Sequence, residues 1–473
     1  MCTSDRGVTP EAQPGVVIVG GGIAGLSAAY ELTVRGIPFA LIEASDRLGG
    51  LIRTEHVGGF TIDSGADSML AQKPAALELC QELGLSTRLM TSTPPRTAYV
   101  YARDRLHSLP SPSVFGIPTT EAGLASYDLL SESARAEIVR LAVQNDQATG
   151  AESAPSDESV ASFFRRQFGN ETVSLIAEPL LGGIHAGDVE QLSMESVAPR
   201  LASAARNGSV LRAFRNLPTS SDPEGMFRAL RGGMCELVDA IAERLPRDAV
   251  RLETPAASIT HSSSSFQIGT PRGSLQSRAV IVAAPARAAA AMLRTLDPTL
   301  AARCGVVPYV STVSIALTWR RSEVTHPLEG SGFVVARQHS ALRITACTWV
   351  SSKWAERAPQ DMVLLRAFLG NAHDQEVVTL SDDTLISIAV RDLGRVLGIS
   401  AEPHLTRVQR WMNAGAQHNV GHRANLGHID RQLRNLPGLF LCGSGFHSIG
   451  IPDCVADGRT SAVAAADYVK IHK

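Results

Sequence analysis

The chain has 473 residues, 44% of them hydrophobic and 19% charged, which is ordinary for a protein that buries a sizeable core. Its 44 basic and 46 acidic residues give a net charge of -2, so the charge balance predicts no nucleic-acid partner. The spread of the seven cysteines, the lack of an apolar signal segment and the lack of a long apolar run predict a cytoplasmic protein without disulfides or a membrane-spanning helix.

The first elements in chain order form a βαβ pattern. A β-branched run at 15–19 predicts a buried parallel strand, 26–32 favours a helix that ends near Gly36, and 39–43 predicts a second strand. Between the first strand and the helix lies GGGIAG, which contains a GxGxxG motif. The strand before it and the helix after it are the context that a dinucleotide site requires.

The three glycines of the motif have separate roles. Gly20 permits a tight turn, Gly22 lets the backbone approach a pyrophosphate, and Gly25 allows close packing of the helix on the strand. Glu43 ends the second strand, where its carboxylate would accept hydrogen bonds from ribose hydroxyls. No arginine adjoins Glu43 to bind a 2′-phosphate, so the pattern disfavours NADP.

The rest of the chain alternates between irregular, helical and strand-like segments. Proline and serine enrichment predicts irregular connections at 91–118, while 119–187 is expected to be mostly helical apart from a polar loop at 147–157. Further strands are expected at 251–285, 313–317, 362–369 and 439–443, and small-residue helices at 283–292 and 454–469.

A second glycine pair follows the second strand. The stretch EASDRLGG at 43–50 has the form ExxxRxGG, and 62–66 has the sequence IDSGA. Both resemble the FAD-binding fingerprint of the amine-oxidase-like flavoprotein superfamily. The glycine-rich stretch 439–454 resembles the segment with which that superfamily returns to the nucleotide-binding sheet and completes the flavin site.

This resemblance implies an α/β fold, α+β overall, with a discontinuous Rossmann-type FAD-binding domain, a mixed-sheet substrate domain and a helical subdomain that could face a membrane. The FAD-binding domain would comprise 1–72, 227–300 and 425–473, the substrate-binding domain 73–118, 188–226 and 301–424, and the helical subdomain 119–187. The implied FAD contacts are Gly20, Gly21, Gly22, Ile23, Ala24, Gly25, Glu43, Ala44, Arg47, Gly49, Gly50, Leu51, Gly65, Ala66, Asp67, Ser68, Ala256, Trp411, Ile449, Gly450 and Ile451.

Further stretches are similar to one branch of the superfamily, the oxygen-dependent protoporphyrinogen or coproporphyrinogen oxidases. The clearest is EPLLGGIHAGD at 178–188. The chain departs from that branch at 416–418, where AQH replaces the usual PQY, and at Ala256, which stands where the family has an adenine-side valine. Shorter matches lie at 232–234, 357–359, 410–411, 421–422 and 450–454.

The resemblance implies oxidation of protoporphyrinogen IX to protoporphyrin IX by FAD, with oxygen as acceptor and release of hydrogen peroxide. Coproporphyrinogen III is the alternative substrate, and extra basic residues around the slot would favour it because it carries more propionates. Arg96 would pair with a propionate, Phe368 would stack on the tetrapyrrole, Leu328 would form an apolar wall and the Gly183 carbonyl would face the macrocycle. We expect no metal site and identify no general base, because the flavin carries the chemistry.

Two other functions stay open on the sequence. An amine oxidase would need aromatic rings around the amine, whereas the matching C-terminal loop offers Phe446-His447 and the chain is only 5% aromatic. A carrier that holds flavin and porphyrin without turnover would not need the flavin contacts. The resemblance also leaves open a homodimer and peripheral contact of 119–187 with the inner face of the cell membrane.

Overall fold

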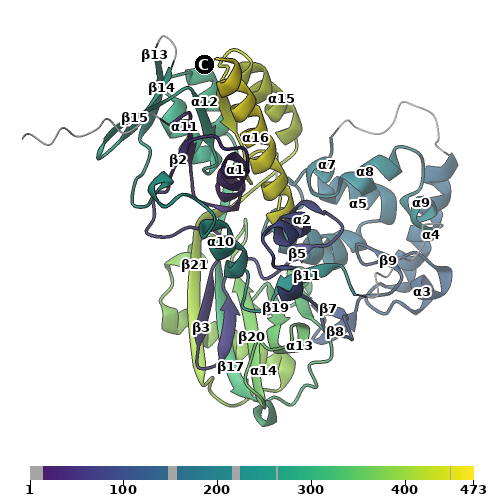
Figure 1. Cartoon of the computed structure of the whole chain (residues 1–473). Coiled ribbons are helices and arrows are strands. Elements are labelled where there is room, and N and C mark those ends of the chain that lie inside the picture. The colour runs from purple at the N-terminus through teal and green to yellow at the C-terminus, as the bar shows by residue number, and fades with distance from the viewer. Residues whose placement is uncertain (1–13, 148–156, 216–223, 263–264, 448, 473) are drawn as a thin grey trace, which may run out of the picture.

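The computed structural model describes residues 14–147, 157–215, 224–262, 265–447 and 449–472. Figure 1 shows a sheet with its helices at the top, a larger sheet below it and a group of helices at the side. The polar loop expected at 147–157 lies almost wholly outside the described residues.

The upper sheet has five parallel strands in the order β12-β2-β1-β16-β22. Val16 of β1 lies opposite Phe39 on one side and Ala279 on the other. Every residue of β1, β2 and β16 is buried, as β-branched runs predict for a sheet covered on both faces. The expected α/β fold is therefore confirmed. The strands are β12 Val250–Arg251, β2 Phe39–Ile42, β1 Val16–Val19, β16 Ala279–Val282 and β22 Leu439–Leu441.

Helices cover both faces of this sheet. Successive residues of a strand point to opposite faces, so neighbouring residues of β1 belong to two different apolar clusters. Val16 and Ile18 pack in a cluster with α1, α2, α10 and α16, whereas Val17 and Val19 pack with α11, α12, α15 and the hairpin strands β13 to β15. The elements are α1 Ile23–Val34, α2 Ala75–Glu82, α10 Cys235–Ala242, α16 Ile451–Ile471, α11 Ala286–Leu293, α12 Pro298–Gly305, α15 His422–Leu433, β13 Ser258–Ser262, β14 Ser265–Thr270 and β15 Gly273–Ser277.

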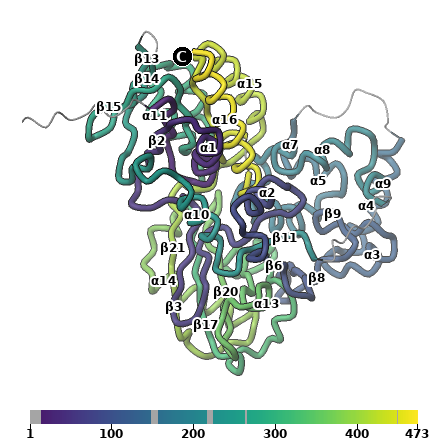
Figure 2. The backbone as a smooth tube through the Cα atoms, in the orientation of Figure 1, coloured from purple at the N-terminus to yellow at the C-terminus, as the bar shows by residue number. Residues whose placement is uncertain are grey.

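The two ends of the chain meet in this upper part. Helix α16 packs along α1, and a Cβ at Gly458 would overlap the carbonyl oxygen of Ala24, so the close approach requires glycine. The purple N-terminal and yellow C-terminal segments accordingly lie side by side in Figures 1 and 2. The C-terminal return to the nucleotide-binding sheet is thus a feature of the fold.

The lower sheet has seven strands in the order β21-β17-β20-β19-β18-β7-β8. Helix α14 covers one face through a cluster that includes Leu365 and Leu385. On the other face Leu364 packs with Phe60 and Ile62 of the β3-β4 hairpin, which links the two sheets. The elements are β21 Leu405–Ala416, β17 Tyr309–Arg320, β20 Met362–Leu369, β19 Ala346–Trp349, β18 Gly332–Val335, β7 Ala98–Ala102, β8 Arg105–Ser108, β3 Thr54–Val57, β4 Phe60–Asp63, α13 Val350–Lys353 and α14 Asp382–Leu397.

The expectation of irregular structure at 91–118 is wrong. Strands β7 and β8 lie inside this segment and form the edge of the lower sheet. Val100 pairs in parallel with Val334 of β18 and antiparallel with His107 of β8. The prolines and serines that suggested irregularity flank these strands, while the tyrosines and valine between them suit a pleated, half-buried surface.

The third part of the molecule is helical, which confirms the expectation for the described residues of 119–187. Its apolar cluster runs from Leu124 and Phe164 to Leu201 and Leu211 and also takes in Val100 of β7, so this part packs against the edge of the lower sheet. Among the described residues, no helix combines the length and apolar character needed to cross a bilayer. The elements are α3 Glu121–Ser126, α4 Glu132–Gln147, α5 Val160–Phe168, the π-helix η2 Val173–Gly182, α6 Gly183–His185, α7 Met194–Val197, α8 Pro199–Ala205 and α9 Val210–Arg215.

Candidate functional site

The turn between β1 and α1 leaves open space in front of a helix N-terminus. Gly20 has a φ of +110°, a conformation that favours glycine. A Cβ at Gly25 would overlap the carbonyl oxygen of Gly20, whereas a Cβ at Gly22 would meet no atom within 4 Å. Gly25 therefore serves the packing of the turn, while Gly22 faces a cradle in which a phosphate would meet the unpaired N–H groups of α1.

Glu43 lies at the carboxyl end of β2, beside this turn. Its carboxylate accepts hydrogen bonds from the Gly21 N–H at 2.6 Å and from the Ser45 N–H at 2.8 Å. The backbone N–H of Thr254 donates to the Glu43 carbonyl at 2.8 Å, which places Ala256 along the same edge of the sheet. The expected ribose and adenine ends of the site therefore adjoin each other.

The second glycine pair packs directly on the first turn. The Gly49 N–H donates to the Gly21 carbonyl at 2.8 Å. The Arg47 guanidinium fixes the loop by donating to the carbonyls of Gly50 at 2.5 Å and Ile52 at 3.0 Å. Beyond the pair, Leu51 is 46% exposed, although it is a large apolar side chain. The ExxxRxGG pattern thus builds a second wall of the cradle around Gly22.

The start of α16 supplies a third wall. Gly450 precedes the helix with a φ of +89°, and a Cβ there would meet no atom within 4 Å. Ile451 is buried and Ile449 is half-buried. Two helix N-termini with open space in front of them, α1 and α16, therefore belong to one domain, as the sequence predicts for a dinucleotide cofactor bound at both chain ends.

Two stacked histidines hold the loop that follows β22. Nε2 of His418 lies 2.9 Å from the Ser444 carbonyl oxygen, and Nε2 of His422 lies 2.9 Å from that of Phe446. Because a carbonyl only accepts, each Nε2 carries the proton. The ring centroids are 3.9 Å apart and the planes differ by 11°. Burial, together with His422, lowers the pKa of His418 to about 4, so both rings fit best as neutral donors.

This pair predicts an acid-sensitive stability. An unfolded histidine titrates near 6.5, whereas His418 in the folded protein has a pKa of about 4. Below pH 6.5 the unfolded chain therefore binds more protons, and the free energy of unfolding should fall by about 3 kcal/mol as the pH drops to 4. We expect the thermal midpoint of His418→Asn to depend less on pH between 7 and 5 than that of the wild type. The exposed His261→Asn should keep the wild-type slope; an equal slope in all three proteins would contradict the prediction.

The segment after β4 joins the upper part to the lower sheet. The indole N–H of Trp411 donates to the Ser64 carbonyl at 3.1 Å, and the Ser314 hydroxyl donates to the same oxygen at 2.7 Å. A Cβ at Gly65 would overlap the Leu51 carbonyl oxygen. The expected contacts Gly65 and Trp411 are therefore brought together with Leu51, although Trp411 lies more than 300 residues from both along the chain.

Buried ion pairs flank this segment. Asp63 pairs with Arg357 at 3.1 Å, and their side chains are 4% and 1% exposed. Burial raises the pKa of Asp63, while Arg357 opposes that shift. Asp67 pairs with both Lys353 at 3.2 Å and Arg366 at 3.1 Å. Although burial would raise the pKa of Asp67, the two cations hold it well below its usual range. Lys353 and Arg366 could not be predicted from the sequence, because a single basic residue in a helix or strand carries no motif.

Three of the four expected substrate residues are half-buried, so a ligand could reach them. Phe368 is half-buried on the same face of β20 as Arg366, whose guanidinium carbon lies 4.9 Å from its ring centroid. Arg96 donates through Nε to Ser92 at 3.0 Å, and its terminal nitrogens have no partner among the described residues. A Cβ at Gly183 would meet no atom within 4 Å.

The placement of Leu328 does not support the role expected for it. Its side chain is 4% exposed and belongs to the apolar cluster that α14 covers. That cluster contains Leu365 and Ala367, which point away from the face that carries Phe368. Leu328 follows Pro327 and has a φ of +59°, so its apolar character reflects packing in the core rather than a slot wall.

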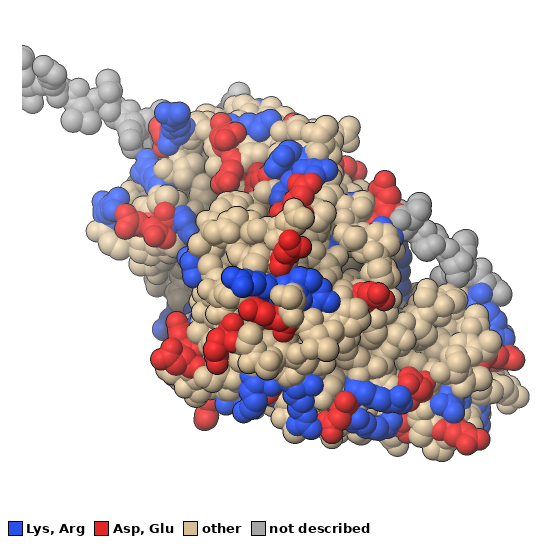
Figure 3. Space-filling model, turned by 90° about the horizontal axis from the view of Figure 1, so that it is seen from below, with Lys and Arg blue, Asp and Glu red and all other residues tan. Residues whose placement is uncertain are grey.

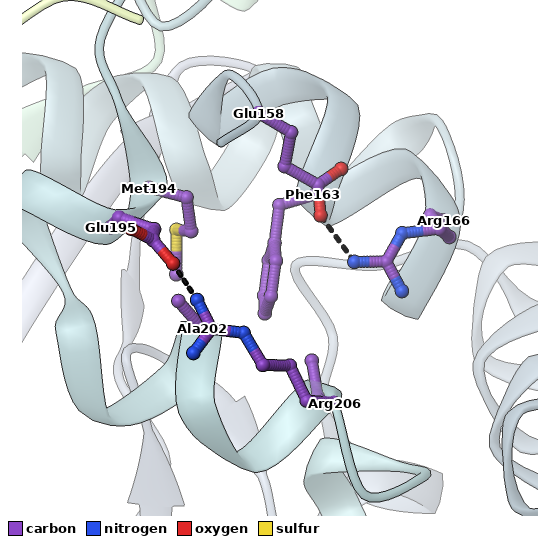
Figure 4. A pocket seen from close by; sticks show the side chains of 8 residues that line it. Glu158, Phe163, Arg166, Met194, Glu195, Ala202 and Arg206 are labelled. Atoms are coloured by element: carbon purple, nitrogen blue, oxygen red, sulfur yellow. Dashed lines mark hydrogen bonds and ion pairs between the residues drawn. The ribbon is translucent and has the colours of Figure 1, made fainter. Parts of the chain in front are cut away.

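Other surfaces offer less to a ligand. Figure 4 shows a pocket in the helical part where Glu158 pairs with Arg166 and Glu195 with Arg206. Its open space of about 10 Å³ has room for roughly one water molecule. On the face seen in Figure 3, basic and acidic side chains are interspersed, so that face presents no field of a single sign.

Comparison with known proteins identifies the family and the fold. Residues 23–466 match the family described as flavin containing amine oxidoreductase. The chain belongs to this family. It is 36% identical to the coproporphyrinogen III oxidase of Bacillus subtilis, over 96% of this chain and 98% of that protein. It is 26% identical to protoporphyrinogen oxidase 2 of Arabidopsis thaliana, over 96% and 94% of the two chains. A crystal structure from Exiguobacterium sp. 255-15, described as a candidate protoporphyrinogen oxidase, has a TM-score of 0.85 at 30% identity and covers 97% of this chain and 99% of its own.

Membership of this family identifies the chain as a flavin-dependent oxidoreductase of the porphyrinogen oxidase branch. The residues of the cradle fit such a cofactor. The open space at Gly22 and Gly450 would admit a pyrophosphate and a flat ring system close to the backbone. The six described cysteines are free, and five of them are buried.

Proposed function

We propose that this protein is an FAD-dependent coproporphyrinogen III oxidase that converts its substrate to coproporphyrin III with oxygen as acceptor. The observation that carries the proposal is the match along nearly the whole chain with the Bacillus subtilis relative of that name. The sequence resemblance favoured protoporphyrinogen IX, with coproporphyrinogen III as the alternative. The alternative now has the better support.

The charges of the site favour the same substrate. The terminal nitrogens of Arg96 have no partner among the described residues, and Asp67 pairs with two cations, Lys353 and Arg366. Coproporphyrinogen III carries four propionates and protoporphyrinogen IX two, so a site with surplus positive charge suits the former. Arginine binds a carboxylate through two parallel hydrogen bonds, which fits Arg96 for this role.

The residues of the chain orient and shield the reaction. FAD, when bound, would take six electrons in three steps from the macrocycle and pass them to three oxygen molecules, giving three molecules of hydrogen peroxide. Glu43 and the two helix N-termini would hold its ribose and phosphates. Phe368 would present a ring face to the macrocycle, and Arg96 would fix a propionate. The pyrrole protons would leave to solvent, because we identify no evident base among the described residues of the site.

A parallel anaerobic assay tests the proposal. Purified holoprotein is mixed in a stopped-flow instrument with coproporphyrinogen III or protoporphyrinogen IX, and flavin reduction is followed by absorbance. We expect faster reduction by coproporphyrinogen III. Faster reduction by protoporphyrinogen IX would replace the proposed substrate. Failure with both, together with reduction by simple amines, would identify an amine oxidase instead, and tight porphyrin binding without reduction would indicate a carrier.

Arg96→Met serves as the matched variant in this assay. Loss of a charge-assisted hydrogen bond costs about 1.5–3 kcal/mol, so KM for coproporphyrinogen III should rise about ten- to hundredfold. Arg103→Met is the control, because Arg103 lies in the turn of the β7-β8 hairpin that follows Arg96 but donates to the Leu129 carbonyl at 3.1 Å and to Glu171. An unchanged KM in Arg96→Met would remove Arg96 from the substrate site.

A further inference from the structure

One buried guanidinium contacts both the expected flavin side and the expected substrate side of the site. Nη1 of Arg366 donates to the Gly65 carbonyl at 2.8 Å and to the Asp63 carbonyl. Nη2 pairs with Asp67 at 3.1 Å. The guanidinium carbon lies 4.9 Å from the ring centroid of Phe368. The planar guanidinium of Arg366, a fork of two terminal nitrogens, thus binds the loop after β4 through its edge and contacts an aromatic ring with its face.

Arg366 is buried among these contacts. The residue is 6% exposed, and its Nε has no partner among the described residues. A small space lies beside it, lined by Ile62, Asp63, Asp67, Ala316, Val350, Leu364 and Arg366. A buried charge destabilises a protein unless its partners compensate, and an apolar residue of similar volume is often as stable. A role beyond stability would therefore account for an arginine at this position.

The chemistry of the fork is specific to arginine. Lysine has one nitrogen and no planar face, so an ammonium held by Asp67 could not also bridge the two loop carbonyls and lie flat against a ring. Lys353 already supplies a second positive charge to Asp67 at 3.2 Å. Two side chains therefore supply positive charge to Asp67. Of the two, Arg366 is the one that also links Gly65 to Phe368.

We infer that Arg366 is a positioning residue that couples the flavin-contacting loop 63–67 to the substrate-facing ring of Phe368. Its fork sets the backbone of that loop against the cofactor, and its face sets the plane of the Phe368 ring on which the tetrapyrrole stacks. The substrate half of this inference, which concerns Phe368, rests on the proposed function. The cofactor half, which concerns the loop 63–67, rests on membership of the family alone.

The test measures two affinities in the holoprotein and its variants. The dissociation constant of FAD is measured by the fluorescence of released flavin, and that of coproporphyrin III by quenching of its own emission. In Arg366→Met we expect both affinities to fall about tenfold, since one charge-assisted interaction is lost on each side. Arg366→Lys should behave like Arg366→Met for FAD, because charge without the fork does not hold two carbonyls.

A double-mutant cycle with Phe368→Leu separates the two halves. In the Phe368→Leu background, Arg366→Met should no longer lower coproporphyrin affinity, because the ring through which it acts is gone, yet it should still lower FAD affinity. Arg321→Met is the stability control: Arg321 likewise donates to two backbone carbonyls, of Val324 and His326, both at 2.8 Å, but beyond the far end of β17.

The outcomes are distinguishable. If Arg366→Met changes neither affinity more than Arg321→Met does, Arg366 is a structural residue and the inference fails. If Arg366→Lys retains full FAD affinity, charge rather than the fork is what matters, and the inference also fails. A wild type that binds FAD but neither binds coproporphyrin III nor is reduced by either porphyrinogen would overturn the proposed function, and with it only the substrate half of the inference.

Discussion

Replacing Gly22 with alanine is expected to leave the apoprotein folded but to lower its affinity for FAD by about ten- to hundredfold. A Cβ at Gly22 meets no protein atom within 4 Å, so the methyl group costs the free protein little. It would occupy the space in which a pyrophosphate approaches the backbone, and overpacking of a tight contact costs about 1–3 kcal/mol. Titration of the apoprotein with FAD, followed by flavin fluorescence, gives the affinity.

Gly25→Ala is the matched control for this prediction. Its Cβ would overlap the Gly20 carbonyl oxygen inside the turn, so the apoprotein itself should lose stability. The two alanine variants should therefore differ in the thermal midpoint of the apoprotein. Wild-type FAD affinity in Gly22→Ala would show that the cofactor does not approach this turn.

Removing Arg357 is expected to cause the largest loss of stability, about 3–5 kcal/mol in Arg357→Met. Asp63, its partner at 3.1 Å, would be left buried with a charge that only the Thr54 hydroxyl and the Met234 N–H still bind. Burial already raises the pKa of Asp63, and loss of Arg357 would raise it further. A carboxyl whose pKa is raised in the folded state lowers the free energy of unfolding as the pH rises. The loss of stability in Arg357→Met should therefore be greater at pH 8 than at pH 5.

Thermal unfolding of the apoprotein at both pH values measures this effect. The double variant Asp63→Asn with Arg357→Met removes the unpaired charge and should regain part of the lost stability. If the double variant is no more stable than Arg357→Met, the cost comes from lost packing of the arginine side chain rather than from the uncompensated carboxylate.

The nucleotide-binding half could be predicted closely from the sequence, because its signals are local. The β-branched strand at 16–19, the glycine turn and Glu43 lie within a single βαβ unit, and each residue type has one main reason to stand there. The helix at the C-terminus begins at Ile451 instead of near 454, since Gly450 and Pro452 already provide a helix start.

The substrate side was predicted less well, because its contacts join distant parts of the chain. The sequence resemblance suggested that Leu328 forms a wall of the substrate slot. Its side chain instead packs in the apolar cluster that α14 covers. The edge strands β7 and β8 were missed because their pairing partner, β18, lies more than 200 residues away. Lys353 and Arg366 carry no motif, and only the fold brings both to Asp67.

The sequence by itself determined the class of cofactor site and the family resemblance, since glycine spacing and strand patterning act over a few residues. Only the tertiary structure decided which charges meet. Asp63, Asp67 and their three basic partners come from separate elements, and their arrangement depends on how the β3-β4 hairpin packs on the lower sheet. That packing places two cations on one buried carboxylate, and the pKa of Asp67 follows from this geometry rather than from any local sequence pattern.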